Sequence, residues 1–146
     1  TRNEIERLLQ KAGAQRFGVI TDYESRENKI AFDWQNVHIV MRIPTPDPAD
    51  KKFLRTPGGS WHGNPKRARE TYEMECRRRW RCLGLALKAK LAAIEDGITT
   101  FEQEFLPYMV AADGQSIGDK LRPIVEMAKA GLGAIPSQLA LPPGGA

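Results

Sequence analysis

The feature of the sequence with the clearest chemical meaning is the run RRRWR at residues 77–81. It lies within residues 51–90, which hold twelve basic and three acidic side chains, although the whole chain has a net charge of only +4. The remaining residues are therefore net acidic. Because such an asymmetric distribution usually marks the side of a protein that meets a polyanion, the cluster predicts phosphate binding.

Two interpretations of this cluster compete. In the first it is a solvated helix face, on which Glu73 pairs with Arg77 and Glu75 pairs with Arg79 at i,i+4 spacing. That pairing occupies only two arginines and leaves the other basic side chains without acids nearby in the sequence, which favours phosphate binding as the second interpretation. The predicted phosphate-binding residues are Lys51, Lys52, Arg55, Lys66, Arg67, Arg77, Arg78, Arg81 and Lys88.

A second group of candidates lies in the connector 44–63, whose prolines and glycines exclude regular structure. Its basic residues alternate with Phe53 and Trp61, which predicts a groove where nucleobases stack on the rings while lysine and arginine hold phosphates. The alternative is a mobile loop that the same two aromatic residues attach to the core.

Catalytic and metal-binding patterns are missing from the sequence. The two histidines, His38 and His62, stand in distant segments, and neither lies at metal-ligand spacing from a cysteine. No nucleophile motif or phosphate-cradling glycine loop is present, and the spacing of the acids Asp22, Asp33, Glu102 and Glu104 singles none of them out. We expect a protein without enzymatic activity, cofactor or metal, with a metal-dependent nuclease as the remaining alternative.

The two cysteines, Cys76 and Cys82, lie six residues apart on one predicted helix. Their side chains point in different directions at about 9 Å of helical rise, so a disulfide is not expected. This arrangement fits a reducing, intracellular setting. No stretch approaches the ~18 apolar residues of a membrane span, and no targeting signal is visible, so we expect a soluble protein.

The first predicted elements are a short helix and three strands. Asn3 and Glu6 form an Asn version of the capping box, and Gly13 ends the helix. Strands are expected at 16–23, 29–34 and 37–43, the last two with a strict period of two and joined by the two-residue loop Gln35-Asn36. They form an antiparallel meander with one apolar face that requires a helix over it.

A long helix at 65–96 is expected to cover that face. Asn64 is its predicted N-cap and Pro65 its first residue. Apolar residues step by three or four along it and predict a buried seam, while the arginines fan over the exposed surface. The seam residues are Tyr72, Cys76, Trp80, Leu83, Leu87, Leu91 and Ile94.

Shorter elements follow the long helix. Thr99 and Glu102 predict a capping box for a brief helix with Phe101, Phe105 and Leu106 facing inward. Residues 108–111 are expected to form a fourth strand or an extended segment before a turn at Asp113-Gly114, and a final helix is expected at 117–130. Its face carries Leu121, Ile124, Val125 and Ala128. The fold class is therefore α+β, with one domain at 1–131 and a Gly/Pro-rich tail at 132–146.

Parts of the sequence resemble known proteins. Residues 79–81 and 88–91, together with FEQEFL at 101–106 and YMV at 108–110, resemble a set of uncharacterised proteins of tailed phages and prophages. The resemblance spans about the middle third of the chain. It implies a phage or prophage setting and favours a role in DNA transactions or anti-defence over housekeeping metabolism.

The predicted order of elements is also similar to two nucleic-acid-binding folds. Three antiparallel strands followed by a long helix resemble the core of phage single-strand annealing proteins. Helix, three strands and helix resemble a double-stranded-RNA-binding domain, from which this chain departs because its main helix is too long and its basic residues extend beyond the first turn. No signature residues of either family are matched.

These observations predict a nucleic-acid-binding accessory protein, with DNA preferred, for phage replication, recombination, annealing or repair in the cytoplasm of a bacterial host. A homo-oligomer is possible, and no membrane or small-molecule partner is expected. The alternative is a protein-interaction module, such as an anti-defence inhibitor or an assembly subunit, that presents the same basic helix face to an acidic partner.

Overall fold

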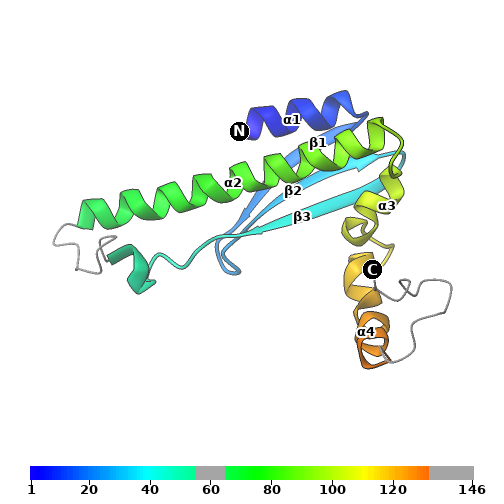
Figure 1. The fold of residues 1–146 in the computed structure, drawn as a ribbon. Coiled ribbons are helices and arrows are strands. Elements are labelled where there is room, and N and C mark those ends of the chain that lie inside the picture. The colour runs from blue at the N-terminus through cyan, green and yellow to red at the C-terminus, as the bar shows by residue number, and fades with distance from the viewer. Residues whose placement is uncertain (55–64, 132–146) are drawn as a thin grey trace, which may run out of the picture.

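A computed structural model describes residues 1–54 and 65–131 and confirms the α+β class (Figure 1). The elements, in chain order, are α1 (Arg2–Lys11), β1 (Arg16–Asp22), β2 (Glu27–Trp34), β3 (Val37–Pro44), the 3-10 turn η1 (Lys51–Leu54), α2 (Pro65–Glu95), α3 (Phe101–Phe105), the 3-10 turn η2 (Leu106–Tyr108) and α4 (Ile117–Ala130). Within the described residues no helix is long and apolar enough to cross a membrane.

The sheet has the predicted meander topology, with strand order β1-β2-β3 and both pairings antiparallel. The register aligns Phe32 of β2 with Phe17 on one side and with Ile39 on the other. Gln35 and Asn36 form the two-residue loop, and their positive φ angles of 46° and 63° are those of a type I′ turn. Asparagine tolerates this conformation, which explains why the loop works without glycine.

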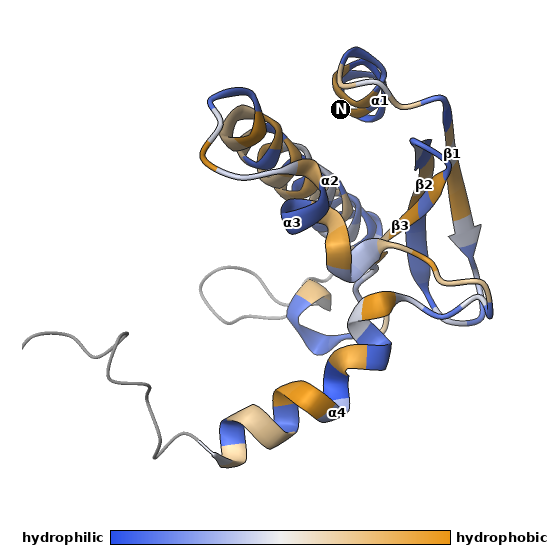
Figure 2. Ribbon diagram, turned by 90° about the vertical axis from the view of Figure 1, so that its right-hand side faces the viewer, coloured by the Kyte–Doolittle hydropathy of each residue, from blue (hydrophilic) through white to orange (hydrophobic). Residues whose placement is uncertain are grey.

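Helices α1 and α2 cover one face of the sheet (Figure 2). The fully buried Ile5 and Leu9 of α1 and Leu87 of α2 belong to one core cluster with Ile30 and Phe32 of β2. The predicted seam of α2 is confirmed from Trp80 to Ile94, because these members belong to the cluster or pack against it. The first two predicted members, Tyr72 and Cys76, lie outside the cluster, and Tyr72 meets Phe53 of η1 instead.

The start of α1 differs from the prediction. The helix begins at Arg2 with Thr1 as N-cap and no capping side chain, so the Asn3 capping box is wrong. The first helical bond, from Ile5 N to Thr1 O (2.9 Å), is set by the burial of Ile5 rather than by a cap. Gly13 follows the last turn with φ of 104°, as predicted.

The connector after β3 contains one regular turn, η1, that the sequence did not predict. The backbone N–H of Lys52 donates to the Asp50 carboxylate (3.0 Å), and that of Phe53 donates to the Asp50 carbonyl (3.1 Å). The ring of Phe53 is only 2% exposed and meets Tyr72 of α2 edge to face. Arg55, Trp61 and the predicted N-cap Asn64 lie outside the described residues, as does the tail 132–146.

The elements after α2 correct two details. The capping box of α3 is formed by Thr100 and Gln103, one residue beyond the predicted pair, and Phe101 and Phe105 are buried while Leu106 is 41% exposed. Of the two alternatives predicted for residues 108–111, the extended segment is the one observed, because Met109 and Val110 make only isolated bridges, to Ile39 and Ser116. Helix α4 has the predicted bounds and extends away from the sheet and α2 (Figures 1 and 2).

Candidate nucleic-acid interface

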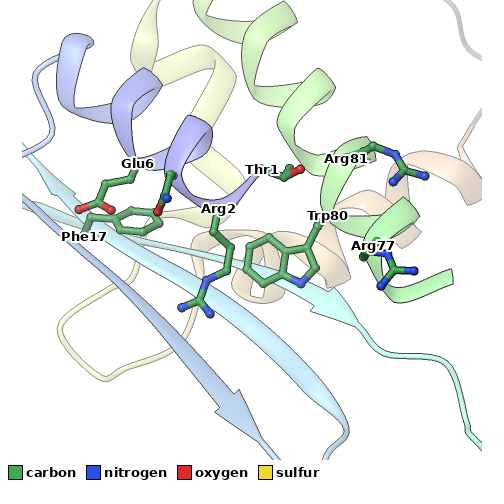
Figure 3. Close-up of a pocket in the computed structure, with 8 residues that line it drawn as sticks. Thr1, Arg2, Glu6, Phe17, Arg77, Trp80 and Arg81 are labelled. Atoms are coloured by element: carbon green, nitrogen blue, oxygen red, sulfur yellow. The ribbon is translucent and has the colours of Figure 1, made fainter. Parts of the chain in front are cut away.

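An open cleft of about 540 Å³ lies between α1, β1 and α2 (Figure 3). It brings together three arginines and two aromatic rings from three separate elements. The lining residues are Thr1, Arg2, Asn3, Glu6, Phe17, Arg77, Trp80 and Arg81.

The cleft exists because α1 approaches α2 closely at a glycine. A Cβ atom on the buried Gly84 would lie 3.8 Å from Ile5 Cγ1 and 3.8 Å from Thr1 Cγ2, so the first turn of α1 rests on the backbone of α2. Trp80 lies one turn before this glycine, and Arg77 and Arg81 share a stripe of α2 at i,i+4 spacing. The close approach therefore sets Arg2 opposite the basic run.

The cleft is net positive. Its arginines face one carboxylate among the lining residues, that of Glu6, and within the described part of the chain none of Arg2, Arg77 and Arg81 forms an ion pair. The Arg2 guanidinium lies 5.8 Å from the centre of the Trp80 ring, within range of a cation–π contact. In Figure 3 Trp80 points toward Arg2, and the two arginines of α2 extend away from it.

One of the two predicted ion pairs of α2 is present, because Arg79 Nε lies 3.5 Å from Glu75 Oε1. Arg78, which was not a predicted partner, holds the same carboxylate more closely with two hydrogen bonds of 2.9 and 2.7 Å, and Arg79 also donates to the Pro44 carbonyl. The bonds from Arg78 lower the pKa of Glu75 to about 2. No ion pair joins Glu73 to Arg77 among the described residues. Arg77 thus retains an uncompensated charge, and the expectation that Arg78 is left without an acid is wrong.

A second cleft, of about 330 Å³, adjoins the first and shares Arg81 with it. It is lined by Lys52, Phe53, Thr71, Met74, Glu75, Arg78 and Arg81. The ammonium of Lys52 lies 5.0 Å from the centre of the Phe53 ring, so this lysine continues the basic surface onto η1. Because Phe53 is buried, its ring is not free to stack on a base, and it attaches the connector to α2 as in the alternative interpretation.

The remaining predicted residues lie outside both clefts. Lys88 lines a separate apolar groove with Leu8, Trp34 and Phe101, toward the C-terminal end of α2. Lys51 on η1 and Lys66 and Arg67 at the start of α2 are exposed. The structure therefore unites Arg77, Arg81, Arg78 and Lys52 and separates them from Lys88.

The cleft residues that carry its other positive charge and its two aromatic rings were not found from the sequence as binding residues. Trp80 was assigned to the buried seam but is only half-buried, and Arg2 and Phe17 come from elements distant in the sequence. The position of Trp80 inside the run of arginines was the available signal. No local pattern indicated Arg2 or Phe17, because their place depends on how α1 and β1 pack against α2.

A further polar cluster lies on the other face of the sheet. The Asp33 carboxylate accepts hydrogen bonds from Arg16 and pairs with His38, residues directly opposite it in the β1-β2 and β2-β3 registers. These bonds, that from Arg16 first, lower the pKa of Asp33. Among the described residues no group of histidine, cysteine and acidic side chains could hold a metal ion.

Comparisons of the chain with protein families, with curated proteins and with solved structures find no match.

Proposed function

We propose that this protein binds nucleic acid, with DNA preferred, through the cleft between α1, β1 and α2. The observation that carries the proposal is that Arg2, Arg77 and Arg81, all without ion pairs among the described residues, line one cleft together with the half-buried Trp80. Unpaired guanidinium groups lose little on binding phosphate, because no internal ion pair has to be broken.

The biological role that we propose is that of a non-enzymatic accessory protein in phage replication, recombination, annealing or repair. The support for the phage setting is the sequence resemblance at residues 79–81, 88–91, 101–106 and 108–110. The support for binding rather than catalysis is that the cleft gathers cations and rings around one carboxylate, a composition suited to holding a polyanion.

The test is the salt dependence of binding to a fluorescently labelled oligonucleotide, measured by anisotropy. Three guanidinium groups on phosphates predict a slope of log K against log salt of about −2 for a single strand. The double variant Arg77→Gln, Arg81→Gln should reduce the slope to about −0.7 and weaken binding at low salt.

The control is Arg122→Gln, which removes another exposed arginine, on α4, where it pairs with Asp119 (2.7 Å). It should leave the slope unchanged. Undiminished binding by the double variant would refute the site, and equal losses per charge removed in the control and the double variant would show that only net charge matters.

A protein-interaction module is the second candidate, and the exposed apolar residues of α4 favour it. Ile124, Val125 and Met127 are 60%, 48% and 72% exposed. This candidate would be supported over the first if the protein did not bind DNA at ~50 mM salt and light scattering showed a stable oligomer or complex.

A further inference from the structure

We propose that the cleft accepts an unstacked base, so that its ligand is single-stranded nucleic acid held by stacking on Trp80 as well as by phosphate contacts. This inference rests on the proposed function and specifies the form of nucleic acid that the cleft binds.

The first argument comes from how the aromatic rings of the chain are used. Trp34 stacks on Phe101 at 3.7 Å between ring centres, and Phe53 meets Tyr72 edge to face. Trp34 and Phe101 pack in or against the core, and the contact of Phe53 with Tyr72 attaches η1 to α2. Within the described residues Trp80 has no aromatic partner, and its only cation–π contact is with the exposed Arg2. Its half-buried indole is therefore a ring that a ligand can reach from the cleft, and of the two aromatic residues that line the cleft it is the one in contact with a cleft arginine.

The second argument is the arrangement of charge around that ring. Arg77 and Arg81 extend from α2 on one side of Trp80, and Arg2 lies on the other (Figure 3). A strand that contacts the α2 arginines on one side and Arg2 on the other passes the indole between them, and the guanidinium of Arg2 can stack on a base as it now lies over the ring. Phe17 of β1 supplies an apolar wall at the same cleft.

The third argument separates a single strand from a duplex. In a duplex the faces of the bases are covered by their neighbours, so a protein reaches only base edges in the grooves. The Trp80 ring lies in a cleft of about 540 Å³ flanked by α1 and β1, which suits one or two extruded bases and not a double helix. The adjoining cleft that shares Arg81 extends the basic surface to Lys52, along which the strand continues.

The test compares the affinity of the protein for two single strands of about ten nucleotides. One is oligothymidylate, and the other is an abasic strand with the same backbone charge. Because one stacked base is worth about five-fold to a hundred-fold in affinity, the full protein should bind oligothymidylate tighter than the abasic strand by at least five-fold. The two strands should show the same salt slope, since their phosphate contacts are the same. A duplex of equal length should bind more weakly than oligothymidylate.

Variants then assign the difference to Trp80. Trp80→Leu should bind both strands with the affinity that the abasic strand has for the unmodified protein, and Trp80→Phe should recover most of the preference. Tyr23→Leu removes a ring that is 89% exposed on the β1-β2 turn and should keep the full preference. The comparison of strands uses the unmodified protein, so it remains decisive if Trp80→Leu fails to fold.

The outcomes separate this inference from the proposed function. Equal binding of thymidylate and abasic strands, or tighter binding of duplex, overturns stacking and leaves phosphate binding standing. Absence of binding to every strand at ~50 mM salt overturns both. A preference for thymidylate that Trp80→Leu abolishes and Trp80→Phe restores supports the inference.

Discussion

Two substitutions of Gly84, where α1 contacts α2, should change the stability of the protein in opposite directions. Glycine inside a helix is less favourable than alanine by about 1 kcal/mol. An added Cβ would lie 3.8 Å from its nearest neighbours, Ile5 Cγ1 and Thr1 Cγ2, which is ordinary van der Waals contact. Gly84→Ala should therefore stabilise the protein by about 0.5 to 1 kcal/mol.

Gly84→Leu should act in the opposite sense. Its Cγ lies about 1.5 Å beyond Cβ, where the side chains of Ile5 and Thr1 leave no room, so α1 has to move. Overpacking of this kind costs about 1 to 3 kcal/mol. A displaced α1 also carries Arg2 away from Trp80, so this variant should bind nucleic acid more weakly than Gly84→Ala, which leaves the cleft intact.

The assay is urea unfolding followed by far-UV circular dichroism, with the midpoint compared at constant slope. Ala89→Leu, at an exposed position of the same helix, is the control for a larger side chain and should change stability by less than about 0.5 kcal/mol. If Gly84→Ala destabilised the protein, or if Gly84→Leu were as stable as Gly84→Ala, the packing of α1 on α2 at this glycine would be refuted.

Three further predictions use the same unfolding measurement. Leu87→Ala, at a fully buried position, should lower the free energy of unfolding by about 2 to 5 kcal/mol, and a decrease of less than about 1 kcal/mol would contradict the place of Leu87 in the core. Glu75 has its folded pKa lowered to about 2 from an ordinary 4.5, so its pairing with Arg78 stabilises the protein above pH 4.5 and is lost as pH falls toward 2. Glu75→Gln should remove this part of the acid sensitivity, at most about 1 kcal/mol because Arg78 is 55% exposed. Gly118→Ala should destabilise the start of α4 by about 1 to 3 kcal/mol, because its Cβ would lie 2.8 Å from the Pro107 carbonyl oxygen; an unchanged midpoint would contradict that contact.

The sheet and α2 could be predicted because the spacing of their apolar residues identifies the face that is buried. The alternation in 29–34 and 37–43 and the seam of α2 both lead to the observed core. The residue at which a helix begins was harder to predict from the sequence than its buried face. Thr99 and Thr100 are equally good caps, and the burial of Phe101 and Phe105 decides between them, so the box forms one residue later than predicted.

The ion pairs of the basic run show why local spacing did not determine the site. Both Arg78 and Arg79 lie within reach of Glu75, at i,i+3 and i,i+4. Arg79 is drawn to the carbonyl of Pro44 at the end of β3, a contact that no helical spacing reveals, and Glu75 is left with Arg78 as its principal partner. Among the described residues, Arg77 and Arg81 are the arginines of the run that form no ion pair.

The unequal lengths of the two helices account for where the basic surface lies. At 10 and 31 residues, α1 and α2 are about 15 and 46 Å long. The two helices run side by side from the contact of Thr1 with Gly84, so α2 before Trp80 extends beyond the start of α1 (Figure 1). Covering this part with a third helix would desolvate basic side chains such as Arg77 without supplying acids, at a cost that apolar packing does not offset. The charge thus keeps one stretch of α2 open, and Trp80 lies at its boundary, where the apolar seam ends and a ligand can reach the ring.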